Sequence, residues 1–175
     1  MSNSRNINVL NFKDKLIMTI FCSYDDGALE IIDRVKDCIV RRGYSQCKIV
    51  SDYRYPVQRR HEDNDQHFLR KSVFWLENSD ACLFVFLKGF DNQGVAFELK
   101  HACDHLPNKL ETSLVAMEKS RSKITTCLIR GTIKNLASQK KLNIRFFKGE
   151  KQLCNFCSYA ALSFLKKQIL YLMDR

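Results

Sequence analysis

Glu98 is the residue whose surroundings in the sequence most strongly favour chemistry. It lies in the segment 91–102, where a helix is expected to begin shortly after the strongly apolar run 81–87. Small and apolar residues surround it, so its carboxylate is expected beside the carboxyl end of a buried strand. Open α/β sheets bind their ligands at that end. We therefore take Glu98 as the candidate catalytic residue, with a solvated helix carboxylate as the alternative.

Other polar side chains follow the ends of two expected strands. The first strand ends near Cys22 and the third near Leu87, and these ends should meet where the strand order reverses. The residues that would bind a substrate there are Ser23, Tyr24, Asp25, Asp91 and Asn92. A long polar loop, 52–65, should overhang the same end and contribute Arg54, which would either hold a phosphate or stay solvated.

Apolar periodicity predicts five strands that alternate with five helices. The strands are expected at 15–24, 48–50, 81–87, 124–129 and 143–147. The helices are expected from Gly27 to Gly43 and at 66–78, 93–105, 133–140 and 153–173. The alternation indicates a parallel sheet with right-handed crossovers. We expect a three-layer, flavodoxin-like α/β fold with five parallel strands in the order 2-1-3-4-5. The chain should form one domain over 1–175, with 1–14 as an N-terminal extension.

Two short motifs resemble those of a known group of proteins. Phe21-Cys22-Ser23-Tyr24 resembles the opening of TIR domains, in which a strand ends in a Ser-Tyr pair. The segment 91–102 is similar to the nucleoside 2-deoxyribosyltransferase pattern, an Asp and a Gly followed by a Glu and then a small helical residue. The chain therefore resembles the nucleoside 2-deoxyribosyltransferase-like and TIR-like superfamily over roughly residues 15–130.

The resemblance implies cleavage of an N-glycosidic bond in a nucleoside, a nucleotide or NAD, or exchange of its base. It would make Glu98 the carboxylate that acts at the anomeric carbon, and Asp91 or Asn92 a ribose or base contact. Tyr24, Asp25 or Asp91 could assist the leaving base. The sequence departs from the transferase pattern at Lys100 and lacks a glycine-rich end to its first strand. Hydrolysis and binding without turnover therefore both stay open, the latter in a nucleotide sensor or a signalling module.

Charge and cysteine usage bear on partners and location. The net charge of +10 favours anionic partners, but no nucleic-acid-binding motif accompanies it, so a nucleotide-type small molecule is the preferred partner. The polar N-terminus and short apolar runs predict a cytoplasmic protein without a membrane segment. Most of the eight cysteines should be buried, reduced thiols.

Two further features are interpreted conservatively. Cys154 and Cys157 form one CxxC pair, and His101 and His105 lie four apart, but their order matches no familiar zinc module. No metal and no cofactor are expected. The last helix carries more apolar residues than one face of a sheet needs, so a homodimer through that helix is possible beside simple core packing.

Overall fold

The sheet sets the architecture of this protein, which is described here by a computed structural model covering residues 12–119, 131, 135, 138 and 142–173. All five strands of the sheet are parallel, in the order β2-β1-β3-β4-β5. The expected fold class and strand order are confirmed. The strands are β1 (Met18–Phe21), β2 (Cys47–Ile49), β3 (Ala81–Phe86), β4 (Ser113–Glu118) and β5 (Asn143–Phe147).

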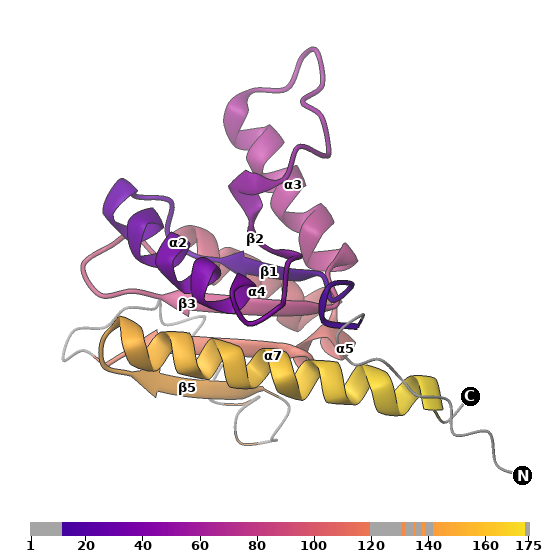
Figure 1. The fold of residues 1–175 in the computed structure, drawn as a ribbon. Coiled ribbons are helices and arrows are strands. Elements are labelled where there is room, and N and C mark those ends of the chain that lie inside the picture. Colours follow the sequence, from indigo (N-terminus) through magenta and orange to yellow (C-terminus); the bar gives the residue numbers. More distant parts are fainter. Residues whose placement is uncertain (1–11, 120–130, 132–134, 136–137, 139–141, 174–175) are drawn as a thin grey trace, which may run out of the picture.

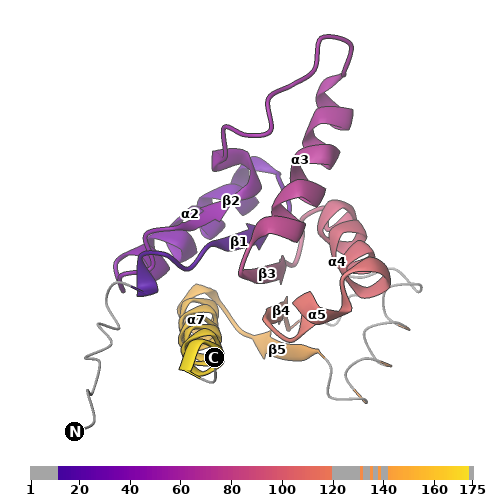
Figure 2. The same cartoon turned by 90° about the vertical axis from the view of Figure 1, so that its right-hand side faces the viewer.

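Helices cover both faces of the sheet (Figures 1 and 2). α2 and α7 pack on one face, and α3, α4 and α5 on the other. Their bounds are α2 (Asp26–Val40), α3 (Asn64–Asn78), α4 (Gln93–His105), α5 (Pro107–Leu110) and α7 (Glu150–Met173), with a short 3-10 helix η1 (Val50–Asp52) after β2. This layering follows from the sequence, because the central strands are apolar on both faces and need cover on both.

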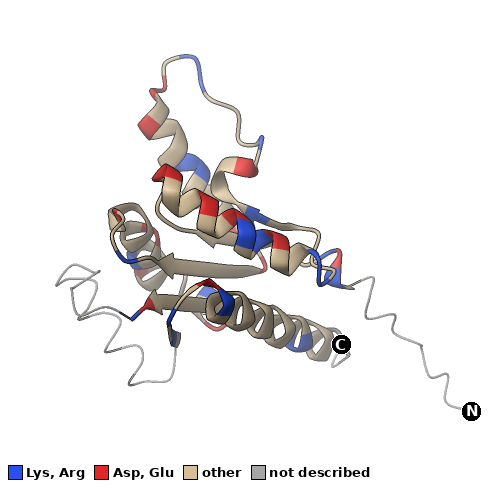
Figure 3. Ribbon diagram, turned by 60° about the vertical axis from the view of Figure 1, so that its left-hand side comes forward, with Lys and Arg blue, Asp and Glu red and all other residues tan. Residues whose placement is uncertain are grey.

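The helices begin close to the expected positions. α3 starts where the Asp63 carboxylate accepts a hydrogen bond of 2.7 Å from the backbone N–H of Gln66, a standard N-terminal cap. α4 has the predicted bounds, whereas α7 begins three residues earlier than expected, at Glu150. Acidic and basic residues are interspersed along α2, so its outward face carries no single sign of charge (Figure 3).

β4 lies between the expected helix 93–105 and the expected strand 124–129, where no strand was predicted, so that part of the prediction was wrong. Residues Leu114 to Met117 of β4 are buried and pair with β3 on one side and β5 on the other. The apolar run is only four residues long between polar neighbours, so periodicity alone does not distinguish it from a loop. The strand expected at 124–129 lies outside the described residues, as does most of the helix expected at 133–140.

Two apolar cores hold the layers together. One lies between the sheet and the α2/α7 layer, and includes Ile32 of α2 and Phe164 of α7. The other lies between the sheet and the α3/α4/α5 layer, and includes Leu76 of α3 and Leu99 of α4. None of the helices in the described part of the chain combines the length and apolar character that a membrane span requires.

Candidate functional site

The ends of β1 and β3 lie side by side. The two strands pair in parallel register, with Phe21 opposite Phe84, so their carboxyl ends leave the sheet at neighbouring points. β2 lies on the far side of β1 and β4 on the far side of β3, which places the reversal of strand order between β1 and β3. The loops to α2 and to α4 therefore start together, as an α/β ligand site requires.

Glu98 is buried rather than solvated. It is the sixth residue of α4 and is only 5% exposed. Its neighbours on the helix pack on the sheet. Val95, Leu99 and Ala102 form the packed face of the same helix. A carboxyl group in that position loses most of its hydration, so the chain must supply polar partners or the group must stay protonated.

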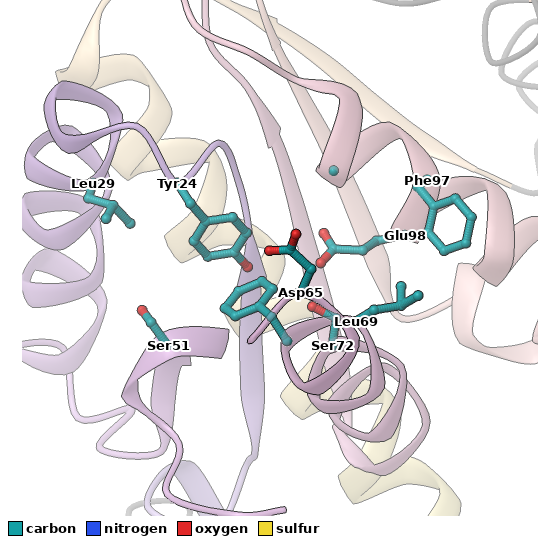
Figure 4. A pocket seen from close by; sticks show the side chains of 10 residues that line it. Tyr24, Leu29, Ser51, Asp65, Leu69, Ser72, Phe97 and Glu98 are labelled. Carbon is teal, nitrogen blue, oxygen red and sulfur yellow. The ribbon is translucent and has the colours of Figure 1, made fainter. Parts of the chain in front are cut away.

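A cavity of about 670 Å³ opens beside Glu98 (Figure 4). Its walls come from the end of β1, the start of α2, η1, α3 and the first turns of α4. The lining residues are Tyr24, Leu29, Ser51, Asp65, Phe68, Leu69, Ser72, Gly94, Phe97 and Glu98. Most of the wall is apolar, and the described lining includes two carboxyl groups but no Lys or Arg. The volume falls within the usual range for small-molecule sites.

Three buried polar atoms in this cavity lack a hydrogen-bond partner among the described residues. They are the phenol oxygen of Tyr24, the hydroxyl oxygen of Ser72 and Oε2 of Glu98. Buried polar groups in folded proteins are nearly always paired, and each unpaired one costs about 1–3 kcal/mol. All three belong to residues that line one cavity, so they are available to one another and to a polar molecule that enters it.

Burial raises the pKa of Glu98 from its ordinary value of 4.5 to about 8. Loss of hydration is the main cause, and the nearby Ser72 hydroxyl opposes it in part. Burial likewise raises the pKa of Tyr24 well above its ordinary value, with a further contribution from Glu98. Near neutral pH most Glu98 side chains are therefore protonated. A strongly shifted carboxyl group in a cavity is typical of a functional site.

Ser23, Asp25 and Asp91 lie together, but they do not line the cavity. Oδ2 of Asp25 accepts hydrogen bonds from the Ser23 hydroxyl and from the backbone N–H of Asp91, both at 3.0 Å. Oδ1 of Asp91 in turn accepts from the backbone N–H of Gln93 at the start of α4, at 2.9 Å. These contacts join the two loops that border the cavity.

Asn92 serves the backbone of the loop between β3 and α4. Its side-chain amide bonds both the N–H and the C=O of Leu87, at 3.1 and 2.8 Å, and donates to the C=O of Phe90 at 2.9 Å. The side chain is buried and is not among the cavity residues. Its described contacts are structural ones.

Arg54 is exposed on the segment between η1 and α3, which projects beyond the sheet (Figure 1). It does not line the cavity either. A different arginine from the same region is paired: Arg70 of α3 bonds the Glu62 carboxylate, with both contacts at 2.7 Å. Arg70 and a backbone bond from Arg59 lower the pKa of Glu62 to about 2. Of the expected residues, the structure brings Tyr24 and Glu98 to the cavity.

Two functional candidates on α3 were not anticipated from the sequence. Ser72 lies four residues after Phe68 and four before Leu76, so it interrupts an otherwise apolar helix face. A polar residue at such a position is a usable signal. Asp65, in the first turn of α3, resembles any acidic residue at a helix start, and only the fold brings it to the cavity.

The cysteines of α7 lie on the other side of the sheet. Cys154 borders a second hollow, of about 520 Å³, together with Cys38 of α2, whereas Cys157 is buried in the core. Burial raises the pKa of Cys154 to about 11, so its thiol is poorly nucleophilic near neutral pH. Within the described ranges, no three His, Cys, Asp or Glu side chains are grouped as metal ligands.

Comparison with known proteins adds no relative to this picture. No protein-family model matches the chain, and no curated protein matches it significantly.

Proposed function

We propose that this protein cleaves the N-glycosidic bond of a nucleoside, a nucleotide or NAD, or exchanges its base, with Glu98 acting at the anomeric carbon. The observation that carries the proposal is the position of Glu98. Its buried carboxyl group faces a cavity of about 670 Å³ at the carboxyl ends of β1 and β3. The resemblance of segment 91–102 to the deoxyribosyltransferase pattern supports the same role.

The chemistry needs an anion beside the sugar. As the base departs, positive charge develops at the anomeric carbon, and a carboxylate in contact range stabilises that charge or captures the carbon covalently. The apolar wall formed by Phe68, Leu69 and Phe97 strengthens this attraction, because charges interact more strongly where water is excluded. The same aromatic rings offer flat surfaces for a nucleobase.

The protonation of Glu98 bears on the choice of substrate. With a pKa of about 8, the carboxyl group must lose a proton before it can stabilise a cation. In NAD the nicotinamide base already carries a positive charge. That charge favours loss of the proton from Glu98, and the base then leaves as a neutral molecule. A neutral base would itself need a proton to leave. Among the three substrate types, the cavity therefore favours NAD.

The phosphates of such a substrate belong outside the cavity. The described lining contains no Lys or Arg, whereas Asp65 and Glu98 both contribute carboxyl groups. A phosphate placed inside would lie near these carboxyl groups without a neutralising cation. The sugar and base are therefore the parts that enter.

The test measures release of free base. Purified protein is incubated with NAD, with a nucleoside monophosphate and with a deoxynucleoside, and the base is quantified by chromatography. Replacing Glu98 by Gln should lower the rate by roughly 100-fold to 1000-fold, the usual effect of removing a key electrostatic partner. Glu77→Gln, which changes an exposed carboxylate of α3, is the matched control. Equal rates in wild type and Glu98→Gln would remove the mechanism.

Binding without turnover is the second candidate. A Glu98 side chain that is protonated near neutral pH is a hydrogen-bond donor, and together with Ser72 and Tyr24 it would suit a neutral polar group such as the sugar or base of a nucleotide. The protein would then be a nucleotide sensor or a signalling module. A ligand that raises the unfolding temperature and is recovered chemically intact would favour this role.

A homodimer through α7 is a separate part of the proposal. Tyr159, Leu162 and Leu170 are exposed, and their spacing places them on one face of the helix. Light scattering should give the mass of two chains, and Leu170→Glu should give the mass of one. A single-chain mass for the wild type at all concentrations would reject the dimer.

A further inference from the structure

The ionised form of Glu98 requires partners beside its carboxylate. A buried carboxylate is stable only if hydrogen-bond donors or cations face it. The described cavity lining contains no Lys or Arg. Because the proposed chemistry uses the ionised form, some group in the cavity must stabilise that form.

Several titratable groups surround Glu98, and most of them stay neutral. Cys22, the residue after β1, and Cys82 on β3 are buried thiols. Burial raises the pKa of both, that of Cys82 to about 12, and Glu98 contributes to both increases. The Tyr24 phenol is also neutral at ordinary pH, because burial raises its pKa. Asp65 is exposed where it borders the cavity, and its carboxylate would repel that of Glu98.

Two hydroxyl groups remain as donors. The side chains of Ser72 and Tyr24 line the same cavity as Glu98. Figure 4 shows Ser72 close to the Glu98 carboxyl group and Tyr24 on the opposite side of the view, beyond Asp65. The hydroxyl oxygens of Ser72 and Tyr24 are buried and have no partner among the described residues, as is true of Oε2 of Glu98. Ser72 is only 1% exposed, and a hydroxyl hydrogen can rotate towards whichever acceptor carries charge.

We propose that Ser72 is a positioning residue for Glu98: its hydroxyl donates to the Glu98 carboxylate and stabilises the ionised form. This inference rests on the proposed function, which gives the ionised form of Glu98 its use, but the hydrogen bond can be tested without any enzymatic activity. The Tyr24 hydroxyl is a second hydrogen-bond donor available to the Glu98 carboxylate. The arrangement gives α3 a role in the chemistry of α4, since Ser72 and Glu98 come from different helices on the same face of the sheet.

The test follows the Glu98 carboxyl group itself. Carbon NMR of glutamate-labelled protein gives its titration, and Glu98→Gln identifies the signal. Ser72→Ala should move the midpoint upwards by about one pH unit, because a hydrogen bond to a charged group is lost. Ser72→Thr, which keeps the hydroxyl, should stay near the wild-type midpoint. Ser51→Ala removes another cavity hydroxyl, from an exposed residue on η1, and is the matched control.

An unchanged or lowered midpoint in Ser72→Ala would overturn the inference. If Ser72→Ala does not fold, Ser72→Cys takes its place, because a thiol is a weak donor and should also raise the midpoint. Titration needs no turnover, so a wild-type protein without glycosidase activity would overturn the proposed function and leave this test intact. In an active protein, Ser72→Ala should shift the rising limb of kcat/KM to higher pH by the same amount.

Discussion

The Asp25 carboxylate accepts a hydrogen bond of 3.0 Å from the backbone N–H of Asp91, across 66 residues of sequence. The contact joins the loop after β1 to the loop after β3. Those loops carry Tyr24 and the start of α4 into the cavity. Asp25 and Asp91, first considered as substrate contacts, thus have an observed role in fixing the border of the site.

Asp25→Ala should loosen this border. The variant loses the acceptor for two hydrogen bonds, from Ser23 and from Asp91. We expect the free energy of unfolding to fall by about 1–2 kcal/mol, with weaker ligand binding. Asp26→Ala, in the first turn of α2, is the control and should cost only a few tenths of a kcal/mol. Urea unfolding measures both, and equal losses in the two variants would contradict the proposed role of the contact.

Asn92→Ala should destabilise the fold more than Asp25→Ala. The amide satisfies the backbone of Leu87 and the carbonyl of Phe90 from a buried position. Removing it leaves buried groups unpaired, at about 1–3 kcal/mol for each one that water does not reach. Thermal unfolding provides the measurement. A variant of unchanged stability and reduced ligand affinity would instead assign Asn92 to the substrate.

Glu98→Gln should change how stability depends on pH. The folded pKa of about 8 lies above the ordinary 4.5, so the folded protein binds more protons between these two values. The stability of the wild type should therefore be greatest relative to the variant below pH 4.5 and should fall as the pH rises towards 8.

The difference between wild type and Glu98→Gln should reach a few kcal/mol across that window and level off above it. Denaturant unfolding at several pH values measures it. A constant difference from pH 4.5 to 8 would mean that Glu98 titrates normally.

Gly94→Leu should fill the cavity without harming the fold. A Cβ atom added to Gly94 would meet no atom within 4 Å beyond its chain neighbours and the backbone of α4, and the residue lines the cavity. Leu is also a better helix former than Gly. We expect unchanged or slightly higher stability and at least a tenfold loss of ligand affinity, whereas Gly94→Ala should bind nearly normally. Wild-type affinity in Gly94→Leu would place the ligand elsewhere.

The sheet was predictable because its central strands are continuous apolar runs separated by helical periods. β3 is buried along its whole length, and its sequence shows no polar interruption. β4 was not predictable in the same way. Its buried run from Leu114 to Met117 is short, and only pairing between β3 and β5 makes it a strand.

The part of the site that the ends of β1 and β3 position was predictable from the sequence. Tyr24 and Glu98 follow from the topology, because Tyr24 comes shortly after β1 and Glu98 lies near the start of the helix that follows β3. Ser72 and Asp65 depend instead on how α3 lies against α4. That contact is set by side-chain packing between helices, which sequence periodicity does not specify. Asn92 and Asp25 look like substrate-binding residues in the sequence, because the same residue types also form hydrogen bonds to the protein backbone. The sequence alone does not distinguish these two roles.

The position of α7 has a consequence for synthesis of the chain. This helix and α2, from opposite ends of the described chain, share one apolar core with the sheet. Until the ribosome has added the residues of α7, the side of β3, β4 and β5 that this helix covers stays in contact with water. A nascent chain of that length is exposed to aggregation and suited to chaperone binding.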